Sequence, residues 1–316
     1  MGQKSWRGQI EYALQVIDQR WNSKHDAKRA NGHRPGQAVP GVFSDGYWNT
    51  VFDRAITLTH WITAHYPELR RFDQVDAGLI TEYLAEKTAT CAPSTVRTHL
   101  ACLRKLQEGL FRRRWLSADI VPAEWAVDSA KVHRGAYPDD EARAIMSLVD
   151  RRYSQYGQAL RFILATGARI DEVFHLRSDK VFSAERRVEL LGKGGKTRRI
   201  RVLDVEVLAE LDLSRRFVYL ERGNERTWKN GLEDSVRGAA DRLGIQRRGV
   251  HGFRGTAAVE FVETHMEILG ASELEARREL AMWLGHNPQR TEVTYAYVSS
   301  THLHKSSNLA FSEHGQ

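Results

Sequence analysis

The chain has 316 residues, and 47 Lys and Arg stand against 40 Asp and Glu, for a formal net charge of +7. Hydrophobic residues make up 41% and charged residues 28%, which excludes a fibrous protein and a wholly disordered chain. At ~100–200 residues per domain, this length predicts about two domains. The positive charge suits an anionic partner such as nucleic acid, although charge alone is a weak argument.

Two further classes of protein are disfavoured. The sequence contains no apolar run of the ~18 residues that a membrane-spanning helix needs, and its first residues lack the apolar core of a signal peptide. Cys91 and Cys102 share no CxxC spacing, so we expect neither a disulfide framework nor a zinc site. This cysteine usage predicts that the protein resides in a reducing compartment, the cytoplasm.

The first third of the chain predicts a group of helices. Apolar residues at helical spacing indicate helices over residues 5–22, from 44–46 onward, over 76–84 and over 96–113, the last capped by Ser94 and Thr95. Residues 23–41 are rich in Lys, Arg, Gly and Pro, and we interpret them as a basic arm or linker. Residues 116–137 contain Pro122 and show weak periodicity, which predicts an interdomain linker.

The helix predicted over 96–113 has a strongly basic polar face. That face carries Arg97, Arg104, Lys105, Arg112, Arg113 and Arg114 against Glu108. We interpret it as a surface that contacts phosphates, with a merely solvated surface as the alternative.

The second part of the chain predicts further helices and one small sheet. We expect helices over residues 139–150, 155–165, 170–176, 204–211, 228–243, 255–269, 272–284 and 291–298. Two short strands, 187–191 and 198–202, flank the turn GKGGK, whose glycines suit a tight hairpin. The chain lacks an alternating βαβ pattern, which disfavours Rossmann and TIM architectures.

Four motifs follow one another in this second part. Arg169 lies in ATGARIDEV, Lys193 in GKGGK, His251 and Arg254 in HGFR, and His286 opens HNPQRTEVTYAYV after Leu-Gly. Each motif alone has an ordinary structural explanation, such as a helix cap or a solvated side chain. Together and in this order, they resemble the catalytic domain of the tyrosine recombinases, the phage integrase and Xer family, over residues 138–300. The segment APSTVR at 92–97 is similar to the core-binding domain of the same family.

The resemblance implies a mainly α fold of two domains: a helical core-binding domain, and a catalytic domain that mixes helices with a small antiparallel sheet. We expect an N-terminal helix and basic arm at 1–41, the helical, SAM-like, DNA-binding domain at 42–115, a linker at 116–137, the catalytic domain at 138–300 and a C-terminal tail at 301–316. The resemblance implies that the tail docks on a neighbouring subunit. A disordered tail is the alternative.

The resemblance also implies an activity. The protein would be a site-specific DNA recombinase of the integrase, resolvase or transposon type, working through a 3′-phosphotyrosine intermediate without metal, ATP or another cofactor. The implied catalytic residues are Arg169, Lys193, His251, Arg254, His286 and Tyr295. The arginines and His286 would bind the scissile phosphate, Lys193 would protonate the leaving 5′-hydroxyl and His251 would assist the tyrosine. Glu172 would fix a neighbouring side chain.

Two of these assignments have a rival nearby in the sequence. Lys196 follows Lys193 by three residues and becomes the general acid if the hairpin register shifts. Tyr297 follows Tyr295 by two residues, and on a helix the two would face ~200° apart, so only one can enter the site. The spacing from His286 favours Tyr295.

The resemblance further implies DNA contacts, partners and a location. The candidate DNA contacts, on the basic helix predicted over 96–113, are Arg97, His99, Arg104 and Lys105. We expect double-stranded DNA with an inverted-repeat core site, a tetramer on paired sites, and a place in the cytoplasm at the nucleoid, in a prokaryote or on a mobile element. Accessory DNA-bending proteins are a further class of partner that it allows, and no membrane is expected. The alternatives are a type IB topoisomerase, which uses the same cleavage chemistry, and a DNA-binding protein without catalysis.

Overall fold

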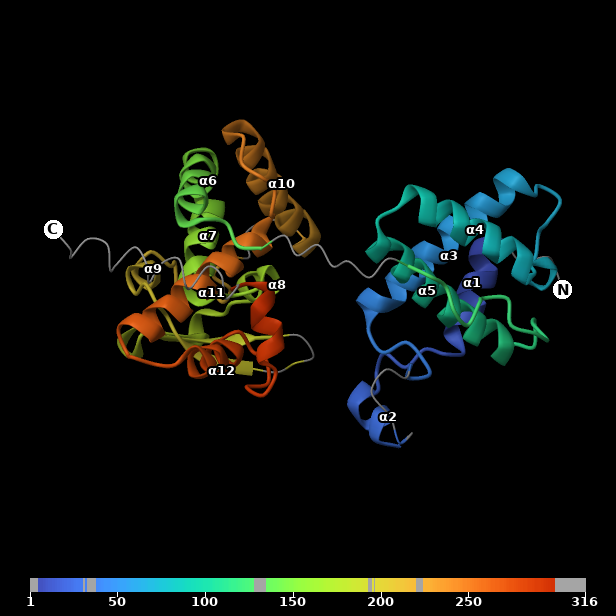
Figure 1. Ribbon diagram of the computed structural model, residues 1–316, viewed down its shortest axis with the longest axis horizontal. Coiled ribbons are helices and arrows are strands. Elements are labelled where there is room, and N and C mark those ends of the chain that lie inside the picture. Colours follow the sequence, from blue (N-terminus) through green and yellow to red (C-terminus); the bar gives the residue numbers. More distant parts are fainter. Residues whose placement is uncertain are drawn as a thin grey trace. The chain divides into compact units, whose positions relative to one another are not determined.

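The computed structural model describes residues 5–30, 32, 38–127, 135–192, 195, 197–219 and 224–298. The chain divides into two compact units, Met1–Val132 and His133–Gln316 (Figure 1). Within the described ranges, none of the helices combines the length and the hydropathy that crossing a membrane requires.

The first unit is helical, and its longer helices begin near the predicted positions. Its elements are α1 (Trp6–Gln15), α2 (Lys24–Ala30), α3 (Asp45–His65), η1 (Phe72–Gln74), α4 (Ala77–Thr90) and α5 (Pro93–Arg112). Ser44 and Asp76 cap α3 and α4 by accepting a backbone N–H within the first turn. The predicted cap of α5 is wrong: this helix follows Ala92, and Pro93 occupies its first turn, where a missing N–H costs nothing.

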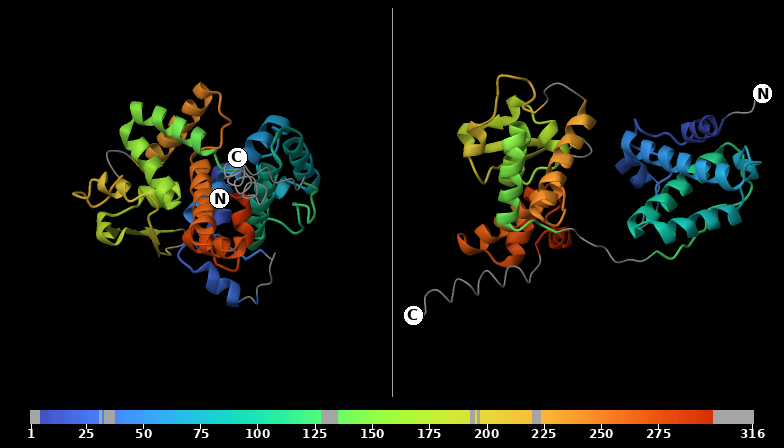
Figure 2. Two further views of the ribbon diagram at one scale, coloured as in Figure 1. Left: turned by 60° about the vertical axis from the view of Figure 1, so that its left-hand side comes forward. Right: turned by 90° about the horizontal axis from the view of Figure 1, so that it is seen from above.

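Helix α5 lies at the centre of the first unit. It packs against α1, α3 and α4, and α1 also packs on α3 (Figure 2). Ile10 and Leu14 of α1 are buried in the same core as Leu103 and Leu106 of α5. Residues before position 42 therefore contribute directly to the core of this unit.

This central position changes the meaning of the basic face of α5. The side chains of His99 and Lys105 are buried. The His99 Nδ1 lies 2.8 Å from the Tyr83 hydroxyl, and the Lys105 ammonium donates to the Val39 carbonyl at 2.6 Å and to Glu108 at 2.7 Å. The prediction that His99 and Lys105 contact DNA is wrong, because both side chains hold the unit together from inside.

The other two candidate DNA contacts are less enclosed. Arg104 donates to the carbonyls of Pro122 and Ala123, at 3.1 Å and 2.6 Å. A DNA phosphate would have to compete with these two acceptors. Arg97 is half-buried near the start of α5, and its role in DNA binding stays a prediction.

The buried His99 predicts an acid-sensitive first unit. Burial, together with the nearby charges of Arg54 and Lys87, lowers the pKa of His99 to about 4, against ~6.5 in an unfolded chain. The unfolded chain binds the extra proton first, so the free energy of unfolding falls as pH drops from ~6.5 to ~4. We expect hydrogen exchange in α4 and α5 to show this loss of stability. His99→Gln should flatten the profile, whereas His60→Gln, at an exposed position of α3, should leave it unchanged. A wild-type profile that is flat over this range would contradict the prediction.

The second unit is also mainly helical. Its helices are α6 (Asp139–Arg152), α7 (Ser154–Thr166), α8 (Ile170–Phe174), η2 (Ser178–Lys180), η3 (Ser183–Glu185), α9 (Glu206–Ala209), α10 (Glu225–Leu243), α11 (Val250–Glu267), α12 (Glu273–Trp283) and η4 (Thr291–Ala296). Helix α11 packs against both α7 and α12 in the core of the unit (Figure 1). A residue on the inner face of α11 can therefore contact the ends of both neighbours.

A three-stranded antiparallel sheet completes the second unit. Its strands are β1 (Val181–Phe182), β2 (Arg187–Leu191) and β3 (Thr197–Arg201), in the order β1-β2-β3. The predicted hairpin and the predicted fold class, mainly α with a small antiparallel sheet, are confirmed. Val188 pairs with Ile200 and Leu190 with Arg198, so Arg198 lies on the sheet face that meets the core.

Helix α11 starts five residues before its predicted position. We expected it to begin at Gly255, but it begins at Val250 and so carries His251 and Arg254 in its first turns. Glycine is a weak helix former, so the glycines in the first turns of α11 argued against a helix there. Packing requires glycine at position 252, because a Cβ there would lie 2.5 Å from the ring of Tyr137.

Candidate active site

Arg169 is positioned by the start of α8. It immediately precedes the helix, and its backbone N–H donates to Glu172 Oε2 at 2.7 Å. Its guanidinium Nη1 donates to the other oxygen of the same carboxylate at 2.9 Å. Glu172 thus caps its own helix and orients the side chain of Arg169 at the same time.

Glu172 is the centre of a buried charge cluster. It is 1% exposed and also accepts a hydrogen bond from Arg198 Nη2 at 2.7 Å, while Arg254 Nη1 lies 3.9 Å from its Oε2. Burial alone raises the pKa of this carboxyl, but the charges and hydrogen bonds of Arg198 and Arg169 hold it below its ordinary value. The carboxylate is therefore ionised at neutral pH and is shared by three guanidinium groups.

Arg198 is a member of this cluster that sequence reasoning missed. Its side chain is 11% exposed, and its Nε and Nη1 atoms have no hydrogen-bond partner among the described residues. The signal was the alternation of β3, which places Arg198 on the same face as the buried Ile200. A buried arginine at a core-facing strand position needs anionic acceptors for its N–H groups, and Glu172 accepts from Nη2 of Arg198 alone.

Arg254 connects three segments of the second unit. It lies on α11, is 1% exposed, and donates to the carbonyl of Gly167 and, at 2.8 Å, to that of Leu284. Its Nε atom has no acceptor within the described part of the chain. Burial, with the charge of Arg169, lowers the pKa of Arg254 to about 10, so the group stays protonated at neutral pH.

The residue before His286, Gly285, packs closely against Arg198 of the cluster. Gly285 has φ +77°, and a Cβ there would lie 2.9 Å from Cδ of Arg198, so the position requires glycine on both counts. The adjoining His286 is half-buried. Burial and the charges of Arg169 and Arg254 lower its pKa to about 4, which keeps the imidazole neutral at neutral pH.

The cluster has an excess of buried hydrogen-bond donors. Three guanidinium groups share the Glu172 carboxylate. In addition, Nε and Nη1 of Arg198 and Nε of Arg254 are buried and have no hydrogen-bond partner among the described residues. Buried N–H groups without acceptors are costly, and guanidinium groups match the oxygens of a phosphate. The arrangement therefore suits an oxyanion that brings its own oxygens.

The two neighbouring tyrosines lie in different surroundings. The hydroxyl of Tyr297 is 3.1 Å from Nε2 of His251. Tyr295 is 52% exposed, and its ring centroid is 3.8 Å from Cζ of the buried Arg277. The structure thus brings Tyr297 to the site through His251, but it does not bring Tyr295 there.

The structure does not describe the two lysines that were candidates for the general acid. Lys193 and its rival Lys196 lie outside the described residues.

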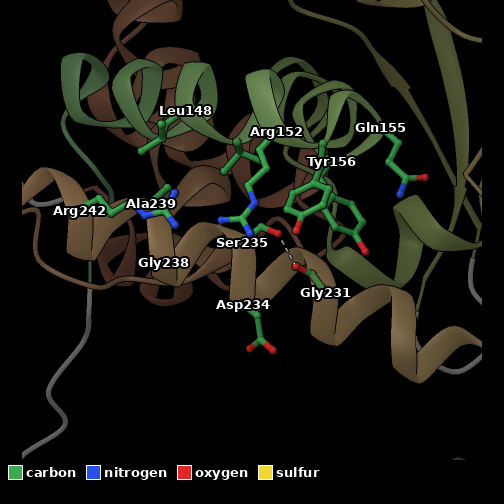
Figure 3. A pocket seen from close by; sticks show the side chains of 12 residues that line it. Leu148, Arg152, Gln155, Tyr156, Gly231, Asp234, Ser235, Gly238, Ala239 and Arg242 are labelled. Atoms are coloured by element: carbon green, nitrogen blue, oxygen red, sulfur yellow. Dashed lines mark hydrogen bonds between the residues drawn. The ribbon is translucent and has the colours of Figure 1, made fainter.

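A hollow of about 410 Å³ lies between α6, the start of α7 and α10, where the Arg152 side chain points toward α10 (Figure 3). None of the residues predicted to act on DNA lines it. Among the described residues, no three His, Cys, Asp or Glu side chains are grouped as a metal site.

The second unit thus combines helices and a three-stranded sheet with an arginine cluster, two histidines and a tyrosine, and the resemblance to the tyrosine recombinases predicted an arrangement of this kind. The profile of the phage integrase family matches residues 137–302, more than half of the chain, and the chain belongs to this family. It is a tyrosine recombinase, as the order of the four motifs predicted.

Solved structures of lambda integrase and of the XerH recombinase have a similar fold. A lambda integrase dimer bound to a COC′ core site is 14% identical, covers 77% of this chain and 71% of its own, and has a TM-score of 0.58. The XerH site-specific recombinase in a post-cleavage complex with palindromic difH substrate is 13% identical, covers 96% and 93%, and has a TM-score of 0.60. A lambda integrase tetramer on a Holliday junction is 12% identical, covers 84% and 75%, and also has a TM-score of 0.60. At these identities the likeness shows the fold, and no curated protein matches the chain.

Proposed function

We propose that this recombinase cleaves and rejoins DNA at a specific site through a 3′-phosphotyrosine intermediate. The observation that carries the proposal is the cluster of Arg169, Arg198 and Arg254, which holds more buried N–H groups than Glu172 can accept. The non-bridging oxygens of a DNA phosphate supply the missing acceptors.

The cluster suits the transition state better than the ground state. Attack on a phosphodiester builds a pentavalent phosphorus with additional negative charge on the non-bridging oxygens. Preorganised donors that meet this charge typically contribute on the order of 10²–10³ each in rate. His286, neutral because of its lowered pKa, donates a further hydrogen bond to a phosphate oxygen.

Cleavage exchanges one phosphate ester bond for another and moves two protons. The tyrosine oxygen bonds to phosphorus, and the bond from phosphorus to the 5′-oxygen breaks. Desolvation and the charges of Arg254 and Arg169 lower the pKa of His251, so this imidazole is neutral and accepts the phenolic proton. The departing 5′-oxygen takes a proton from Lys193, or from Lys196 if the register differs. A second 5′-hydroxyl reverses the step without ATP.

The proposal includes the assembly that such a reaction requires. We propose double-stranded DNA with an inverted-repeat core site as substrate, and a tetramer on paired sites as the active form. The similar structures of a lambda integrase dimer on a core site and of a tetramer on a Holliday junction support it. Docking of the tail 301–316 on a neighbouring subunit, accessory DNA-bending proteins and a place at the nucleoid belong to the same proposal, and the tail lies outside the described residues.

Covalent trapping tests the proposed chemistry. The full chain is incubated with sheared DNA of its source organism and denatured, and the protein-linked DNA is sequenced. We expect adducts at one short inverted-repeat site and their loss in Arg169→Gln, whereas Arg151→Gln, at an exposed position of α6, should retain them. Scattered adducts would instead support a type IB topoisomerase. DNA binding without adducts would support a binding protein without catalysis.

A further inference from the structure

We propose that Tyr297, and not Tyr295, is the residue of this chain that becomes linked to DNA. This inference rests on the proposed phosphotyrosine chemistry and assigns its nucleophile. The spacing from His286 pointed to Tyr295, so the geometry of the second unit argues for a different residue from the one that the sequence favoured.

The surroundings of Tyr297 suit a nucleophile. Its hydroxyl lies 3.1 Å from Nε2 of His251, within reach for direct proton transfer. Cζ of Arg254, a member of the arginine cluster, lies 5.8 Å from the centroid of the Tyr297 ring. The hydroxyl thus lies beside a base and close to the buried N–H groups that would hold the phosphate.

The surroundings of Tyr295 do not suit this role. Its ring lies over the guanidinium of Arg277 on α12 and is 52% exposed. Arg277 is itself fully buried and donates to Glu273 at 2.7 Å and to Thr294 Oγ1 at 3.2 Å. Arg277 therefore holds both the ring of Tyr295 and the residue before it on the α12 side of η4.

The register of η4 allows only one of the two tyrosines to face His251. Tyr295 lies in η4, and Tyr297 directly follows this helix, with its N–H donating to the Thr294 carbonyl at 3.0 Å. A 3₁₀ helix has ~3.0 residues per turn, so positions two apart point ~240° from each other while this hydrogen-bonded turn continues. The flanking Thr294 and Val298 are fully buried, and the Val298 N–H donates to the Thr294 carbonyl at 2.9 Å. Bringing Tyr295 to His251 would expose these side chains and remove two contacts from the buried Arg277.

The turn before η4 separates the spacing argument, which favours Tyr295, from the contact argument, which favours Tyr297. Asn287 accepts the backbone N–H of Arg290 at 2.8 Å through its carbonyl and that of Gln289 at 2.9 Å through its side chain. This turn takes up four residues before the helix starts. The distance in sequence from His286 therefore depends on the length of the turn, whereas the contact with His251 does not.

The site of linkage can be read directly. Cleavage by trypsin after Arg290 and Lys305 gives the peptide TEVTYAYVSSTHLHK, which contains both tyrosines. The trapped adduct of the wild-type chain is digested with nuclease and trypsin, and fragmentation between residues 295 and 297 locates the remaining nucleotide. We expect it on Tyr297. A nucleotide on Tyr295 would overturn the inference and leave the proposed function intact, whereas absence of any tyrosine adduct would overturn both.

Matched variants give a second measurement. Tyr297→Phe should lower adduct formation by at least about 100-fold, and Tyr295→Phe, which keeps a ring over Arg277, should stay within about threefold of wild type. Equal thermal melting of the two variants excludes loss of the fold as the cause. Adduct formation by Tyr297→Phe together with its loss in Tyr295→Phe would overturn the inference.

Discussion

Glu172→Gln is expected to lower the free energy of unfolding by about 3–5 kcal/mol, because removing one partner of a buried ion pair leaves the other charges uncompensated. Here a single carboxylate, 1% exposed, faces the guanidinium groups of Arg169 and Arg198 directly and that of Arg254 at 3.9 Å. Glutamine keeps the shape of the side chain but turns an N–H donor toward guanidinium donors. Equilibrium unfolding in urea measures the change.

The same substitution should also remove part of the pH dependence of stability. The pKa of Glu172 is held below its ordinary value, so its contribution to stability is present above the unfolded pKa of ~4.3 and is lost as pH falls below it. Glu185→Gln is the matched control, since Glu185 is half exposed and lies 3.8 Å from Arg199, and we expect a change below ~0.5 kcal/mol. An equal stability of the two variants would contradict the central role of Glu172.

Arg254→Lys is expected to reduce the rate of DNA cleavage by on the order of 10²–10³ although the positive charge is kept. The guanidinium donates to the carbonyls of Gly167 and Leu284 through two different nitrogens and has a third, Nε, without an acceptor among the described residues. A single ammonium cannot reach both carbonyls and a phosphate at once. Adduct formation in a time course measures the rate.

The effect of Arg254→Lys should separate cleavage from binding. Interactions made only in the transition state lower the rate more than the affinity, so we expect DNA binding to change by less than about tenfold. Arg143→Lys is the control, because Arg143 is an exposed residue of α6 paired with Asp139. Equal losses of binding and cleavage in Arg254→Lys would show that the arginine acts on the fold of the site and not on the transition state.

The position of α5 shows why helical periodicity alone misplaced two DNA contacts. A pattern of polar residues indicates which face of a helix differs from the apolar one, but it does not tell how many neighbours the helix has. Helix α5 packs against α1, α3 and α4, so part of its polar face is covered. His99 and Lys105 then require internal partners, which Tyr83, Val39 and Glu108 provide.

The sequence by itself determined the class of this protein. The caps at Ser44 and Asp76 and the hairpin around GKGGK are local features, since caps and turns depend on neighbouring residues. The order of the four motifs can be read along the chain, and it resembles that of the phage integrase family. They were sufficient for the mainly helical fold and the membership in the phage integrase family.

Only the tertiary structure decided which charges and which tyrosine meet. Arg198 joins Arg169 and Arg254 because strand pairing turns it into the core beside Glu172. Tyr297 reaches His251 because buried contacts set the register of η4. These residues come from segments far apart in the chain, and burial and packing between segments, which spacing does not encode, bring them together.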